Sequence, residues 1–113
     1  MNRKEEIRRY KETARPMGVF GVRHTASGRT FVGSSIDVRA RLNRLRFQLD
    51  HGSHPHRALQ SDWKNLGPEA FVLETLDLLE IPADRPGYDP ADDLRALEGL
   101  WRDKLAASDQ LYD

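Results

Sequence analysis

The chain has 113 residues, of which 38% are hydrophobic and 32% are charged, and its 18 basic and 18 acidic side chains give a formal net charge of zero. This size allows one hydrophobic core and excludes two domains, while the lack of an apolar span or a secretory leader predicts a cytoplasmic protein with no membrane partner. The chain has no cysteine, which excludes disulfides and thiolate metal sites, so any metal ion must be bound by oxygen or imidazole.

Residues 1–16 are rich in charge and poor in apolar groups, which predicts a charged N-terminal arm or a partly exposed helix that Pro16 ends. Residues 17–113 are predicted to form a single domain. It begins with two valine- and phenylalanine-rich runs, 17–23 and 30–33, with Ser27 and Gly28 in the short loop between them. This pattern predicts an antiparallel β-hairpin.

Two helices are predicted next, at 37–50 and 54–65. Apolar residues of the first recur at spacings of four, three and four, which is typical of one helix face: Val38, Leu42, Leu45 and Leu49. Asp37 is suited to cap its N-terminus, and Gly52 to adopt the left-handed conformation after its end. The inward residues predicted for the second helix are Ala58, Leu59 and Trp63.

A third strand at 71–76, a loop at 82–90 and a helix at 91–107 complete the predicted elements. The last helix has an apolar stripe of Leu94, Leu97, Trp101 and Leu105. We therefore predict an α/β (α+β) fold, a small three-stranded antiparallel sheet packed by helices in the order β-β-α-α-β-α.

The two halves of the chain have opposite charge. Residues 1–60 contain 13 basic and 5 acidic side chains, whereas residues 61–113 contain 5 basic and 13 acidic ones. A basic face of this kind suits a polyanion such as nucleic acid. The acidic half alone would instead suit a protein–protein adaptor.

Two tripeptides lie on the predicted hairpin, Gly18-Val19-Phe20 and Phe31-Val32-Gly33, and an arginine-rich helix and a late helical glutamate, Glu98, follow them. This order resembles the GIY-YIG nuclease family, in which two paired strands place catalytic groups beside a metal-bound phosphate. The resemblance covers residues 18–113. It implies an endonuclease that hydrolyses phosphodiester bonds of DNA, or of RNA, with one Mg²⁺ or Mn²⁺ ion. It does not predict an oligomeric state.

The resemblance also implies roles for particular residues. Arg41, eight residues after Gly33, corresponds to the helix arginine that stabilises phosphate charge. Glu98 corresponds to the metal ligand. His54 or His56 is the candidate general base, since the family often has a histidine in this region. We expect Arg41 and Glu98 to meet across a solvent-open cleft.

Four positions depart from the family pattern. Phe20 and Phe31 occupy the positions of the two motif tyrosines in the catalytic site, and a phenyl ring has no proton to give or take. Leu45 stands where many members have a histidine, and Asp113 stands in place of an asparagine. These changes favour an alternative function, a catalytically impaired fold that serves as a nucleic-acid-binding module.

Five further basic side chains are candidates for contacts with a nucleic-acid backbone: Arg39, Arg44, Arg46, Arg57 and Lys64. Trp63 and Trp101 lie on apolar helix stripes and are predicted to pack in the core. His24, on the hairpin, and His51, after the first helix, are the remaining imidazoles.

Overall fold

The computed structural model of the protein describes residues 16–80 and 87–112. The predicted N-terminal arm, except Pro16, and Asp113 lie outside the described residues, as does most of the predicted loop at 82–90. Strands β1 (Gly18–His24) and β2 (Thr30–Ser35) come first, followed by helices α2 (Val38–Asp50) and α3 (Arg57–Leu66). A 3₁₀ turn (Pro68–Ala70), strand β3 (Phe71–Leu78) and helix α4 (Ala91–Ala107) complete the fold. The predicted order of elements is confirmed.

The three strands form one antiparallel sheet in the order β2-β1-β3, with β1 in the centre. Phe20 on β1 lies opposite Gly33 on β2, so the two tripeptides meet at these ends, whereas Val19 lies opposite Ser34 and Phe31 opposite Val22. A bulge between Val19 and Phe20 shifts the pairing of β1 with β3. Because β2 is at the edge of the sheet, side chains from the helices on both faces of the sheet can reach the free edge of this strand, here called the rim.

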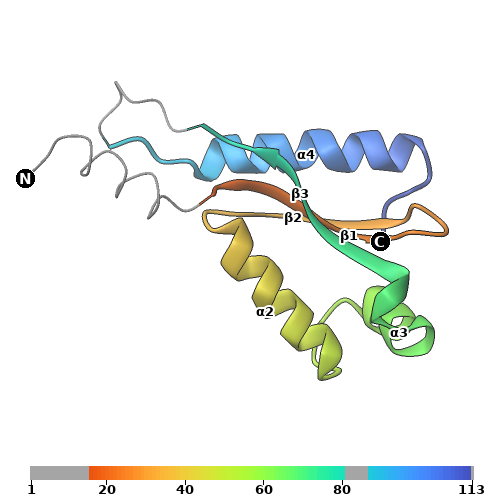
Figure 1. The fold of residues 1–113 in the computed structure, drawn as a ribbon. Coiled ribbons are helices and arrows are strands. Elements are labelled where there is room, and N and C mark those ends of the chain that lie inside the picture. The colour runs from red at the N-terminus through yellow and green to blue at the C-terminus, as the bar shows by residue number, and fades with distance from the viewer. Residues whose placement is uncertain (1–15, 81–86, 113) are drawn as a thin grey trace, which may run out of the picture.

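Helices α2 and α3 lie on one side of the sheet and α4 lies on the other (Figure 1). Since side chains alternate along a strand, Phe20 and Val22 point to one layer while Val19 points to the other. The core beside α2 and α3 is a single cluster of buried side chains: Phe20, Val22, Val38, Leu45, Leu49, Leu59, Trp63, Phe71 and Tyr112. Leu45 is therefore a core residue, as predicted.

The two tryptophans belong to different layers. Trp63 on α3 is buried, and its indole N–H donates a hydrogen bond to Asp50 of α2. Trp101 on α4 is half-buried and donates to Asp77 of β3. Trp63 thus packs in the core as predicted, whereas Trp101 is only half-buried and does not belong to the core. Both indole N–H groups are satisfied by carboxylates.

Local chemistry explains both ends of α2 and the start of α3. The Asp37 side chain accepts a hydrogen bond from the Ala40 N–H and caps α2 as predicted, and Gly52 has a φ of +73° just beyond the helix. The predicted start of α3 at residue 54 is wrong, because the helix begins at Arg57. Pro55 disfavours helical geometry at His54, and His56 takes the N-cap position.

Steric crowding accounts for the glycine of each tripeptide. A Cβ at Gly18 would lie 2.0 Å from the backbone oxygen of Asp77 on β3. A Cβ at Gly33 would lie 2.5 Å from the para carbon of Phe20. Glycine thus allows the strands to approach at one position and the Phe20 ring to lie across β2 at the other. In the described parts of the chain, no helix is long and apolar enough to cross a membrane.

Candidate active site

A pocket of about 520 Å³ lies at the rim of the sheet and contains all six positions that the sequence singled out for catalysis. Its lining comes from β1, β2, α2, the segment before α3, and α4: Phe20, Phe31, Arg41, His54, His56 and Glu98. Of the five residues predicted to contact a nucleic-acid backbone, Arg44 also lines the pocket. The other four, Arg39, Arg46, Arg57 and Lys64, are exposed outside it.

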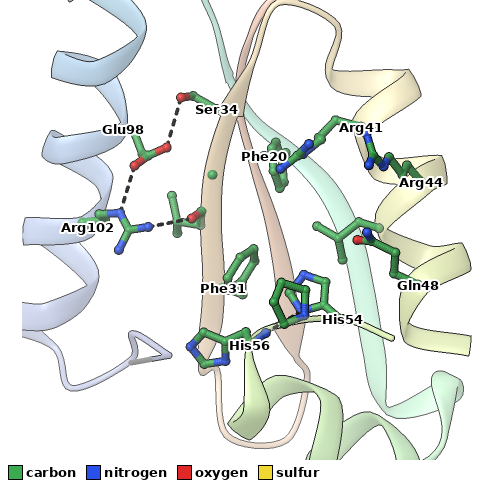
Figure 2. A pocket seen from close by; sticks show the side chains of 14 residues that line it. Phe20, Phe31, Ser34, Arg41, Arg44, Gln48, His54, His56, Glu98 and Arg102 are labelled. Carbon is green, nitrogen blue, oxygen red and sulfur yellow. Dashed lines mark hydrogen bonds and ion pairs between the residues drawn. The ribbon is translucent and has the colours of Figure 1, made fainter. Parts of the chain in front are cut away.

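Strand β2 runs through the middle of this pocket (Figure 2). Glu98 and Arg102 approach from α4 on one side, and Arg41 and Arg44 from α2 on the other. The edge position of β2 makes this possible, because side chains from both layers meet at an edge strand. Arg41 and Glu98 therefore line one pocket, from opposite sides of the rim of β2.

The α2 wall of the pocket is basic. Arg41 and Arg44 are one turn apart, and Leu45, on the same face, anchors the helix in the core. Among the described residues, no carboxylate forms a salt bridge with either arginine, whereas Arg46 pairs with Asp50 at 3.9 Å. Two guanidinium groups are thus available to an anion on this wall.

Glu98 is held at the α4 wall by two partners. Its Oε1 accepts a hydrogen bond from the Ser34 hydroxyl at 3.0 Å, and its Oε2 accepts one from Nε of Arg102 at 3.1 Å. Nη2 of Arg102 also donates to the backbone oxygen of Val32 at 3.2 Å. The carboxylate is therefore oriented by β2 and by its own helix.

Sequence reasoning did not single out Ser34, Gln48 or Arg102, which also line the pocket. Arg102 carried a signal, because it follows Glu98 by four residues and such pairs meet on a helix surface. Gln48 similarly follows Arg41 by seven residues, or two turns. Ser34 carried no such signal, since its bond to Glu98 joins residues 64 positions apart.

The two histidines both use Nδ1 to accept a backbone hydrogen bond. The His56 N–H donates to Nδ1 of His54 at 3.1 Å, and the Leu59 N–H donates to Nδ1 of His56 at 3.2 Å. A neutral imidazole has one donor and one acceptor nitrogen, so each ring in this arrangement has its proton on Nε2. Each ring thus offers the pocket a hydrogen-bond donor, and a base role at Nε2 requires loss of the backbone bond.

Burial lowers the pKa of His54 below its usual value, and the electrostatic effects of His56 and Arg41 lower it further. His54 is therefore neutral at pH 7. Phe31 contributes to this burial, because its ring packs edge-on against both imidazoles at 5.3 Å between centroids.

This pKa makes a prediction about stability. As the pH falls below about 6.5, the unfolded chain binds the proton at residue 54 before the folded protein does, so the free energy of unfolding decreases until the pH passes the folded-state pKa. The variant His54→Asn keeps an acceptor near Nδ1 but does not titrate. We expect urea unfolding at about pH 7.5 and about pH 5 to show a smaller loss in this variant than in the wild type.

His51→Asn is the matched control, because His51 is exposed at the end of α2 and does not line the pocket. Comparison of the two variants separates the loss of a pocket imidazole from the loss of an imidazole elsewhere. An equal loss in the wild type and in His54→Asn would contradict the assignment.

The other two histidines and Tyr112 interact with residues outside the pocket. His24 Nδ1 lies 2.6 Å from the Ser27 hydroxyl on the hairpin, and the His51 ring stacks on Phe47. The buried Tyr112 donates its hydroxyl to Asp62 at 2.7 Å. Burial and this bond raise the pKa of Tyr112, so its phenol stays protonated and does not replace the missing motif tyrosines.

Solved structures with the same architecture were found by comparison. A mutant form of the catalytic domain of the intron endonuclease I-TevI matches with a TM-score of 0.69 and 20% identity, covering 87% of this chain and 92% of that chain. The catalytic domain of the homing endonuclease I-TevI matches with a TM-score of 0.67 and 24% identity, covering 85% and 95%. No protein-family model matches the sequence, and no curated protein does. Over most of its length, this chain has the fold of a GIY-YIG nuclease catalytic domain.

Proposed function

We propose that the protein binds a DNA phosphodiester in this pocket and hydrolyses it with the aid of one divalent metal ion. The observation that carries the proposal is that Arg41, Glu98 and the two histidines line one pocket at the rim of β2. These residues come from three separate segments of the chain. The matched structures, both of endonuclease catalytic domains, support the same reaction class.

The donor set of the pocket suits a magnesium or manganese ion that keeps most of its water. Glu98 is the one acidic side chain in the lining, and no group of three or more His, Cys, Asp or Glu among the described residues could hold an ion. Mg²⁺ commonly binds through one or two carboxylates, several waters and a substrate phosphate. Glu98 would therefore be the protein ligand, and the ion would supply charge neutralisation and a more acidic bound water.

The remaining groups act on the phosphate. Arg41 and Arg44 donate charge-assisted hydrogen bonds to its oxygens and stabilise the negative charge that develops in the transition state. The Nε2–H groups of His54 and His56 add two donors. A base role for either imidazole needs the proton at Nδ1, and hence rotation of the ring away from its backbone partner.

Cleavage of single-stranded, duplex and branched DNA with Mg²⁺ or Mn²⁺ tests this proposal. Glu98→Ala should abolish metal-dependent cleavage, and Arg41→Ala should lower the rate by about 10²–10³-fold, as for loss of one preorganised donor. Arg95→Ala is the matched control, because Arg95 is an exposed arginine of α4 that lies outside the pocket and is not a predicted nucleic-acid contact. Cleavage that persists in Glu98→Ala would refute the assignment of the metal ligand.

A second candidate function, nucleic-acid binding without cleavage, is favoured by one specific observation. Phe20 and Phe31 give the pocket two phenyl rings and no phenol. This candidate predicts salt-dependent binding that Arg41→Ala weakens, with no product at any metal concentration. Binding without turnover in the wild type would establish it, and metal-dependent turnover would exclude it.

A further inference from the structure

The carboxylate proposed to bind the metal already has a cation beside it. Nε of Arg102 lies 3.1 Å from Oε2 of Glu98, and the guanidinium is also bonded to the backbone oxygen of Val32. The side chain of Glu98 is 26% exposed and that of Arg102 is 43% exposed. The pair is thus partly shielded from water and fixed by a third contact, which makes it stronger than a mobile surface pair.

This cation opposes a divalent ion at the same carboxylate. A carboxylate has lone pairs enough for several partners, so Arg102 does not block Glu98 by occupancy alone. The cost is electrostatic, because an ion bound to Glu98 would lie within a few ångströms of a guanidinium of like charge. Binding of the ion must therefore either overcome this repulsion or be accompanied by movement of Arg102 away from Glu98.

We propose that Arg102 is the internal counterion of Glu98 and weakens the binding of divalent metal to the free protein. A phosphate that enters the pocket is a second anion to which the Arg102 guanidinium can bind. When Arg102 binds the phosphate instead of Glu98, the Glu98 carboxylate is free to bind the metal. Metal and phosphodiester then bind cooperatively, and by linkage each increases the affinity for the other by the same factor. This inference rests on Glu98 as the metal ligand of the proposed function.

Titration of the protein with Mn²⁺ alone, with free Mn²⁺ followed by its electron paramagnetic resonance signal, tests the inference without any assay of activity. Arg102→Gln should bind Mn²⁺ about tenfold more tightly than the wild type. The substitution removes the positive charge that opposes the ion at Glu98, and its effect should equal the free energy of about one charge-assisted hydrogen bond. Arg102→Lys keeps the positive charge but not the fork of donors, and it should stay near the wild-type affinity.

Two further variants make the outcomes distinct. Arg95→Gln removes one positive charge from an exposed part of α4, where Arg95 pairs with Asp92, and should leave the affinity unchanged. The double variant Glu98→Gln with Arg102→Gln should lose the gain. A gain that survives in the double variant would refute Glu98 as the ligand and so the metal site of the proposed function.

The inference itself would be overturned while that site stands if Glu98→Gln abolishes Mn²⁺ binding but Arg102→Gln leaves it unchanged. It would also be overturned if Arg102→Lys tightens binding as much as Arg102→Gln, since the effect would then come from packing and not from charge. Circular dichroism of each variant verifies that it is folded.

Discussion

Replacing Phe31 by tyrosine is expected to raise the rate of phosphodiester cleavage by about 10²–10⁴-fold, the range typical of one general acid–base group. The Phe31 ring lines the pocket, is partly exposed and packs edge-on against both imidazoles. The substitution adds a phenol at the position that the family resemblance assigns to the second motif tyrosine. Single-turnover cleavage of the wild type and Phe31→Tyr at saturating metal measures the effect.

Phe47→Tyr is the matched control, because Phe47 is 62% exposed on α2 and lies outside the pocket. Its added hydroxyl should not change the rate. An unchanged rate in Phe31→Tyr, together with intact DNA binding, would show that the pocket lacks more than this one hydroxyl and would favour the binding module.

Phe20 is a poorer place to restore a tyrosine. The ring is only 2% exposed, and its para carbon, which would bear the hydroxyl, lies over Gly33 on β2. A hydroxyl at this carbon must displace the ring or the strand, and overpacking of a core typically costs about 1–3 kcal/mol. The two phenylalanines are thus equivalent in the motif but not in the structure.

Replacing Gly18 by alanine is expected to lower the free energy of unfolding by about 3 kcal/mol, the upper end of the range for overpacking. The new Cβ would lie 2.0 Å from the Asp77 oxygen and 2.9 Å from the Leu78 Cα. Both are backbone atoms of β3, so no side-chain rotation relieves the contact and the strands must separate. Urea unfolding followed by circular dichroism measures the loss.

Gly99→Ala serves as the opposite control. Gly99 lies on α4, and nothing lies within 4 Å of a Cβ built there. Alanine in a helix is favoured over glycine by about 1 kcal/mol, so this variant should be more stable than the wild type. A loss below about 1 kcal/mol in Gly18→Ala would show that β3 moves aside without strain.

The sequence predicted the order of the elements because each has a clear period or boundary. Runs rich in valine and phenylalanine marked the strands of the hairpin, and the spacing of Val38, Leu42, Leu45 and Leu49 marked α2. The start of α3 was missed because a turn with a capping imidazole, and not a continuous helix, satisfies the backbone around Pro55. Local hydrogen bonds of this kind change where a helix begins by only a few residues, so the predicted helix itself is still found.

The candidate site was predictable where one residue follows a motif at a fixed distance, as Arg41 follows Gly33. It was not predictable where a contact depends on how distant elements pack. The bond between Ser34 and Glu98 requires β2 to lie at the edge of the sheet and α4 to cross it, and the proton positions on His54 and His56 depend on backbone N–H groups nearby. Such details follow from the folded arrangement alone.

The placement of the two tryptophans in separate layers provides two optical reporters. Trp63 lies in the buried layer with α2 and α3, whereas Trp101 lies on α4, beside Arg102 in sequence. Single-tryptophan variants, Trp63→Phe and Trp101→Phe, would therefore let intrinsic fluorescence follow each helical layer by itself. Emission from Trp101 would report events at the Glu98 wall, including quenching by a paramagnetic ion, while Trp63 would report the integrity of the core.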